Sequence, residues 1–173
     1  KIRHALAHVL AQAVQHLHED VKLGIGPAIE NGFYYDFIFK EPLSEEDLKE
    51  IEAEMVRIIS KDYNFEQSSM PKQEAIEYLY KINQPFKAEL ATDLPDETLG
   101  FYTDGDFKDL CKGPHVGNTN EINPAAFKLT HVAGAYWRSD EKRPQMQRIY
   151  GVAFETKEEL ELLVGKQVLY EAW

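Results

Sequence analysis

The sequence predicts an α+β domain in which a mainly antiparallel sheet packs against helices. Helical periodicity dominates the first half of the chain, over residues 2–18, 44–62 and 71–80. From residue 98 onwards the pattern changes to short runs of β-branched and aromatic residues, which Gly, Pro, Asn and Asp separate. Strands and helices do not alternate regularly, so a parallel sheet is not expected.

The first element is an amphipathic helix over residues 2–18. Its apolar side chains recur along one stripe, at Ile2, Leu6, Val9, Leu10, Ala13, Val14 and Leu17. His4 and His8 lie one turn apart and share a face on roughly the opposite side of the helix. Taken alone, this segment predicts two solvated histidines on a surface helix.

Residues 22–39 are typical of β structure. Asn31-Gly32 is a strong hairpin-turn signal, and it is followed by an aromatic run. Gly24 and Gly26 indicate a backbone that turns or lies close to another group. This G-x-G is not a dinucleotide fingerprint, because no helix follows it.

Ser44 begins the next helix, because Asp47 stands three residues on and forms a capping box with a shorter acid. A short extended piece over residues 62–70 follows it. A further helix begins at Pro71, a residue that suits the first turn.

The second half of the chain supplies the remaining strands, over residues 99–104, 107–111, 126–137 and 146–154. Thr156 is the expected N-cap of a short closing helix. We therefore divide the chain into a domain of residues 1–155 and a C-terminal helix or linker of residues 156–173.

The chain has 173 residues and a formal charge of −11, from 30 acidic and 19 basic side chains. This balance argues against a module that grips nucleic acid by itself, because Lys and Arg supply most non-specific affinity for phosphate. No apolar run approaches membrane-spanning length, so no membrane partner is expected. A single cysteine fits a reducing compartment, for which we expect the cytoplasm, with an organelle as the alternative. The first residue is Lys rather than Met, so we expect the chain to be part of a longer protein.

Side chains suited to chemistry concentrate in two stretches, RHALAH at residues 3–8 and DLCKGPH at residues 109–115. Gly-Pro between Cys111 and His115 excludes a helix and places both residues in a loop or at a strand end. If folding joins the stretches, His4, His8, Cys111 and His115 have the donor types of a tetrahedral zinc site. Taken separately, Cys111 would be a small buried side chain and His115 a turn residue.

Lys87 is a further candidate, because it is a lone basic side chain in the otherwise apolar or acidic stretch QPFKAEL. Spacing alone favours an exposed, solvated lysine at this position.

The two stretches, together with LGIGPAIENGFYYDF, FKL and AGAYWRSDEKRPQMQRIYG, resemble the N-terminal editing domain of bacterial-type threonyl-tRNA synthetases. The resemblance covers roughly residues 1–155, and the AGAYWR…QRIYG motif is specific to that family. The HxxxH and CxxxH pairs are shared more widely, with the editing domains of alanyl-tRNA synthetases. The resemblance implies proofreading hydrolysis of seryl-tRNA that was mischarged on threonine tRNA, in the central editing cleft.

Hydrolysis of an aminoacyl ester needs a placed water, a proton acceptor or relay, and stabilisation of the developing oxyanion. His4 and His115 are the candidates for positioning or polarising that water, with His8 and Cys111 lining the pocket.

The resemblance also implies roles for three further residues. Lys87 would bind water or the terminal nucleotide, and Asp109 would hold the ammonium group of the substrate. Tyr35 would shape the pocket and contact the terminal adenosine.

The threonyl-type motifs imply a site without zinc or another cofactor. The alternative is a zinc ion held by His4, His8, Cys111 and His115. The implied partners are the 3′ end of seryl-tRNA and the remainder of a threonyl-tRNA synthetase. No ATP site or class II signature segment is present in the sequence, so ATP-dependent aminoacylation would belong to that remainder. Two other readings stay open: a free-standing deacylase of the alanyl-editing type, and a non-catalytic binding module stabilised by zinc.

Overall fold

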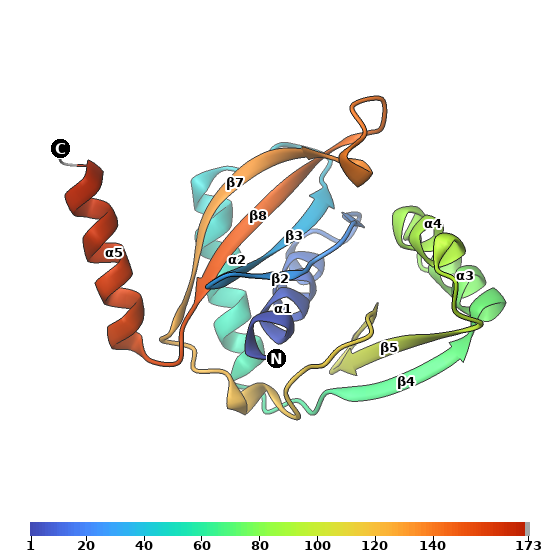
Figure 1. Cartoon of the computed structure of the whole chain (residues 1–173), viewed down its shortest axis with the longest axis horizontal. Helices are drawn as coiled ribbons and strands as arrows, with labels where there is room; N and C mark the ends of the chain where they lie inside the picture. The colour runs from blue at the N-terminus through green and yellow to red at the C-terminus, as the bar shows by residue number, and fades with distance from the viewer. Residues whose placement is uncertain (172–173) are drawn as a thin grey trace.

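The computed structural model describes the backbone of residues 1–171 and the side chains of residues 1–164. Within this part of the chain, helices and antiparallel strands form two lobes around separate sheets (Figure 1). The predicted α+β class with antiparallel pairing is therefore confirmed. Among the described residues, no helix is both long and apolar enough to span a membrane.

The large lobe is a sheet with two helices on one face (Figure 1). Its strands pair in the order β1-β3-β8-β7, and β2 adds to β3. Phe33, Phe37 and Ile149 are fully buried between the sheet and the helices, with the sulfur-bearing Met55 beside them. The elements of this lobe are α1 (Ile2–Leu17), β1 (Lys22–Leu23), β2 (Ala28–Ile29), β3 (Gly32–Ile38), α2 (Glu45–Ile59), β7 (Phe127–Tyr136) and β8 (Gln145–Ala153).

The small lobe is a three-stranded antiparallel sheet with two short helices. Its core is separate from that of the large lobe and centres on Leu79, Leu99 and Phe101. The elements of this lobe are β4 (Glu66–Pro71), α3 (Lys72–Lys81), α4 (Pro85–Asp93), β5 (Thr98–Asp104) and β6 (Phe107–Leu110). Three elements complete the chain: the short helices η1 (Thr119–Glu121) and η2 (Trp137–Ser139), and the closing helix α5 (Lys157–Glu171).

Local sequence signals account for where most elements begin and turn. Ser44 accepts a hydrogen bond from the backbone N–H of Asp47, and the Asp47 carboxylate accepts one in return, so the predicted capping box is present. Asn31 takes a left-handed conformation with φ of 58°, as the hairpin between β2 and β3 requires. Thr156 caps α5 by accepting from the backbone N–H of Glu159. The predicted starts and turn are confirmed, but the closing helix is longer than expected, because it runs over Lys157–Glu171.

Helix α4 was not anticipated from the sequence. Its apolar residues do not fall on one stripe, so the periodicity that identifies the other helices is missing. Pro85 at its first turn is the only local signal. This helix carries Lys87 and is therefore important for the site.

Helix α1 of the large lobe is largely buried rather than on the surface. Every residue from Ala5 to Val14 is buried, including those on the side opposite the apolar stripe. The expectation of two solvated histidines on a surface helix is therefore wrong for His8, which is 3% exposed. Small residues such as Ala7 and Ala11 allow other elements to approach this face closely, a packing that periodicity along one helix does not reveal.

Candidate active site

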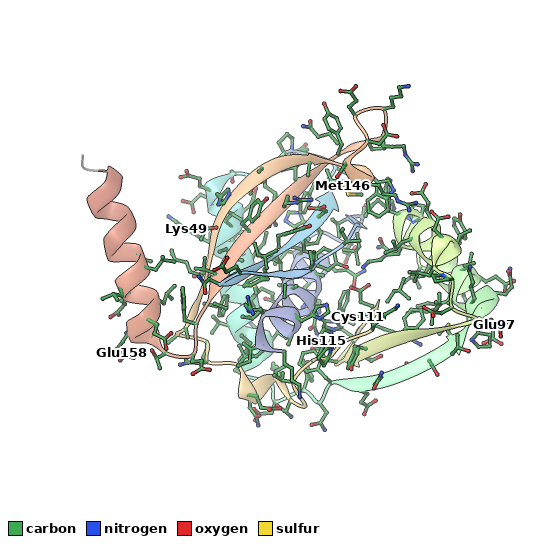
Figure 2. The ribbon with its side chains drawn as sticks, viewed as in Figure 1. Lys49, Glu97, Cys111, His115, Met146 and Glu158 are labelled. Atoms are coloured by element: carbon green, nitrogen blue, oxygen red, sulfur yellow. The ribbon has the colours of Figure 1, made fainter. Side chains whose placement is uncertain are left out.

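A pocket of about 230 Å³ lies between α1, the small lobe and the loop that follows β1. Figure 2 shows Cys111 and His115 beside α1, between that helix and the small lobe. All seven residues that the sequence singled out as site candidates line this one pocket. The lining residues are His4, His8, Tyr35, Lys87, Asp109, Cys111 and His115, together with Ile25, Gly26, Pro27, Leu90, Leu110 and Lys112.

The stretch that follows β6 brings Cys111 and His115 to α1. Gly113 has a φ of 76°, a conformation that glycine adopts without strain, and the Gly113–Pro114 bond is cis. A Cβ atom at Gly113 would stand 2.3 Å from the hydroxyl oxygen of Tyr102, so the loop lies directly on that ring. The ring of His115 in turn packs against Tyr102 with centroids 4.3 Å apart.

His4, Cys111 and His115 form the innermost cluster of the pocket. The Nε2 atom of His4 lies 3.4 Å from Sγ of Cys111, and the rings of His4 and His115 meet edge to face at 4.8 Å. The backbone N–H of Gly113 also donates to Sγ, at 3.2 Å. Both ring nitrogens of His115 are buried without a hydrogen-bond partner among the described residues. A buried polar group without a partner is costly, so this ring is arranged to meet a ligand or water.

Burial keeps the groups of this cluster uncharged. The pKa of His115 is lowered from 6.5 to about 3, mainly by desolvation and in smaller part by the neighbouring His8 and His4. Desolvation also lowers the pKa of His4, and it raises the pKa of the Cys111 thiol. At neutral pH the cluster therefore offers neutral imidazole nitrogens, which accept protons, beside a protonated thiol.

Asp109, Lys87 and Tyr35 form a second, charged group on the pocket wall. The ammonium of Lys87 lies 3.2 Å from Oδ1 of Asp109, and the hydroxyl of Tyr35 donates to Oδ2 at 2.6 Å. Lys87 is only 3% exposed, so the expectation of a solvated lysine is wrong. The reason is that α4 turns this side chain inward, toward a carboxylate from β6 and the face of the Tyr35 ring, 5.0 Å away.

The loop after β1 closes the pocket from the large lobe. A Cβ atom at Gly26 would stand 2.0 Å from the Tyr35 ring, so only glycine lets the backbone lie against it. This close approach is the kind that the glycines of the stretch indicated. Burial and the Asp109 carboxylate raise the pKa of Tyr35 well above its ordinary value, so the hydroxyl stays a donor.

Three residues of the pocket are close enough together to hold a metal ion. One ligand atom each from His4, Cys111 and His115 lies within 4.8 Å of the others, and these three donor types suit zinc. His8 is not in this group, because its Nε2 faces Asp104 at 2.5 Å instead. The residues therefore fit a three-ligand site with one open position rather than the four-ligand site that the sequence suggested as an alternative. At such a site a zinc ion would supply Lewis-acid chemistry to a bound water.

The sequence pattern did not predict two residues that support the pocket, Asp104 and Tyr102. Asp104 ends β5 directly before Gly105, and it is 1% exposed and pairs with His8. Tyr102 supports the His115 ring from the same strand. Neither has a local signal, because each acts through a residue distant in the chain.

A second hollow, of about 330 Å³, lies at the C-terminal end of α1 and lacks such a cluster. The ion pair between Lys40 and Asp20 at its wall is largely exposed, with side chains 77% and 64% accessible. Asp47 there belongs to the capping box of α2. Of these two pockets, the smaller one is lined by the convergent, buried groups, so we assign the candidate site to it.

Residues 99–150 match the family model of the threonyl and alanyl tRNA synthetase second additional domain. This segment contains β5, β6, the Cys111–His115 loop and most of β8. This segment of the chain is therefore similar to that class of domain.

Within that class the sequence matches threonine–tRNA ligases. It is 53% identical to the one from Acetivibrio thermocellus over 165 residues, which is 95% of this chain and 26% of the relative. It is 52% identical to that of Gloeobacter violaceus over 168 residues, 96% of this chain and 27% of the relative. It is 52% identical to that of Thermus thermophilus over 170 residues, which is 91% of this chain and 26% of the relative. The chain therefore spans about a quarter of the length of these relatives.

Proposed function

We propose that this chain hydrolyses the ester of seryl-tRNA mischarged on threonine tRNA, as the proofreading part of a threonine–tRNA ligase. The observation that carries the proposal is the juxtaposition of two groups in one pocket. His4 and His115 provide neutral ring nitrogens, and the buried Asp109–Lys87 pair provides charge of both signs. The match to threonine–tRNA ligases supports the substrate class.

Asp109 would bind the ammonium group of the aminoacyl ester. An ionised carboxylate has about four lone-pair positions. Lys87 and Tyr35 use one position on each oxygen, so room remains for another donor. The Tyr35 hydroxyl holds the carboxylate in place, which limits where the ammonium can lie.

His4 and His115 would orient the attacking water. Their nitrogens accept hydrogen bonds in the neutral form, which is the form that their lowered pKa values favour. The vicinal ribose hydroxyl of the terminal nucleotide can share the proton transfer, so neither histidine has to be the sole base.

Lys87 would stabilise the charge that develops on the carbonyl oxygen. Its ammonium group has three donors, and Asp109 occupies one of them. In a pocket that excludes water, such a donor acts on developing charge more strongly than it would in solvent.

Selectivity would come from the walls of the pocket. A synthetic site that prefers threonine over serine gains only about 1–3 kcal/mol from one methyl group, so a second site is needed to remove errors. The editing pocket can apply the opposite test, because the extra methyl of threonine would clash where the seryl group fits.

The test is hydrolysis of seryl- and threonyl-tRNA(Thr) by this chain, alone and fused to the remainder of a threonine–tRNA ligase. We expect the seryl ester to be hydrolysed much faster than the threonyl ester, at least in the fusion, which can deliver the tRNA end. Equal hydrolysis of both esters by the fusion would contradict the proposal. So would an inactive fusion whose aminoacylation is intact.

One observation favours a second candidate, a non-catalytic module stabilised by zinc: the three potential ligands within 4.8 Å. Purification without chelators followed by metal analysis separates the candidates. Stoichiometric zinc whose removal unfolds the chain would favour the structural role, whereas a folded, metal-free chain supports the hydrolytic one.

A further inference from the structure

A buried carboxylate that no proposed step uses lies behind the pocket. Asp104, at the end of β5, is 1% exposed, and its Oδ1 lies 2.5 Å from Nε2 of His8. Gln12, one turn further along α1, donates from its side-chain amide to the backbone oxygen of Asp104 at 3.3 Å. The end of β5 is thereby held against the same face of α1 that carries His8.

The hydrogen bond defines which nitrogen of His8 carries a proton. A carboxylate oxygen accepts, so Nε2 of His8 must donate. The other nitrogen, Nδ1, is buried and has no partner among the described residues. An N–H group at that position would be buried without an acceptor, which is costly, so the structure favours a bare Nδ1.

The ring of His8 has little freedom to turn. It packs edge to face against Phe107 at 4.8 Å, Phe65 at 5.3 Å and His115 at 5.3 Å. His8 also lines the pocket. The carboxylate, the imidazole and the His115 ring therefore form a continuous series from the core to the pocket.

We propose that Asp104 is a positioning residue: it holds His8, which lines the pocket, in the tautomer with the proton on Nε2 and a bare Nδ1. A catalytic use of this acceptor rests on the proposed hydrolytic function, whereas the tautomer does not. The pair joins residues 96 positions apart in the chain.

The first test needs no substitution. In the chain labelled with ¹⁵N-histidine, long-range ¹H–¹⁵N correlation spectra distinguish protonated from bare ring nitrogens. At a pH at which His8 has one bare ring nitrogen, we expect a protonated Nε2 and a bare Nδ1. A bare Nε2 with a protonated Nδ1 would overturn the proposal.

The second test compares Asp104→Ala with Asp106→Ala. Asp106 is the matched control, because it lies two residues on and accepts from His16 and Gln12 rather than from His8. We expect Asp104→Ala to lose the single His8 tautomer and Asp106→Ala to keep it. An unchanged His8 spectrum in a folded Asp104→Ala chain would refute the positioning role. If that variant does not fold, the wild-type spectrum still decides the tautomer.

Activity supplies the third readout, in the fusion to the remainder of the ligase. We expect Asp104→Ala to lower kcat for seryl-tRNA deacylation by about 10- to 100-fold, the loss typical when a partner that orients a functional histidine is removed. KM should be unchanged, since Asp104 does not touch the substrate. A changed tautomer with unchanged kcat would remove the catalytic part of the proposal. A wild-type fusion without deacylase activity would contradict the proposed function, while the spectra would still test the Asp104–His8 pair.

Discussion

The ammonium group of Lys87 lies 3.2 Å from Oδ1 of Asp109, and the two residues are only 3% and 5% exposed. Lys87 comes from α4 and Asp109 from β6, so the pair forms inside the small lobe. The hydroxyl of Tyr35, from the large lobe, donates to the other oxygen of the same carboxylate. One carboxylate thus joins the two lobes at the pocket wall.

Removing one member of this pair should destabilise the fold, because the other charge would stay buried without its partner. We expect Lys87→Met to lower the free energy of unfolding by about 3–5 kcal/mol. Adding Asp109→Leu should recover part of that loss. Lys112→Met is the control, since its ion pair with Asp96 is exposed, and it should cost about 1 kcal/mol or less. Urea unfolding gives the free energy of unfolding of the wild type and of the three variants. Equal losses in Lys87→Met and Lys112→Met would contradict the expectation.

The same lysine should matter for catalysis. We expect Lys87→Ala and His4→Ala each to reduce seryl-tRNA deacylation by about 10²- to 10⁴-fold, the range for groups that move protons or stabilise charge. His16→Ala and His131→Ala are the controls. His16 binds Glu54 and Asp106, and His131 stacks on Tyr150, both outside the pocket lining. Full activity of the Lys87→Ala, His4→Ala double variant in the ligase fusion would refute these assignments.

Acid should destabilise the chain through His115. Its pKa is about 3 in the folded state against an ordinary value of 6.5, so between these values the unfolded state binds the proton more readily. Stability should therefore fall as the pH decreases from about 6.5 toward 3. His115→Asn should show a shallower decrease over this window. The measurement is the free energy of unfolding by urea at a series of pH values, and identical slopes for both chains would rule out this contribution.

Hydrogen bonds from Glu89 to the large lobe should hold α4 in place. Glu89 on α4 accepts hydrogen bonds from the Trp137 indole and from Arg143, both in the hairpin between β7 and β8. These bonds, the one from Trp137 first, lower the pKa of Glu89. We expect Glu89→Ala to cost about 1–3 kcal/mol and to raise hydrogen exchange in α4 and in the hairpin. Glu50→Ala, at an exposed position of α2, should change neither the free energy of unfolding nor the exchange. Unaltered exchange in Glu89→Ala would show that the hydrogen bonds of Glu89 do not hold α4 in place.

Binding of whole tRNA by this chain alone should be weak and should depend little on salt. The net charge is −11, and three of the basic side chains nearest to the hairpin are already paired with carboxylates. These pairs are Arg138 with Asp93, Arg143 with Glu89, and Arg148 with Asp36. Few phosphates can therefore be neutralised. Affinity measured across a range of salt concentrations checks this, and tight binding with a steep salt slope would be the contrary result.

Much of the local structure could be predicted because its causes are local. The Ser44–Asp47 capping box and the turn at Asn31 depend on neighbours within a few residues. Gly113-Pro114 excluded a helix and placed Cys111 and His115 in a loop, which the structure confirms. Helix α4 was missed, since nothing in its own pattern separates an inward face from an outward one.

The sequence by itself determined the α+β class, the boundaries of most elements and the donor types available to the site, because these follow from periodicity, capping and side-chain chemistry. The tertiary structure alone decided that His8 is buried against Asp104 and that Lys87 faces Asp109 rather than solvent. It also decided which three donors approach within ligand distance. The reason is physical: burial and pairing depend on which surfaces the lobes bring against α1 and α4, and those surfaces come from parts of the chain that are distant in sequence.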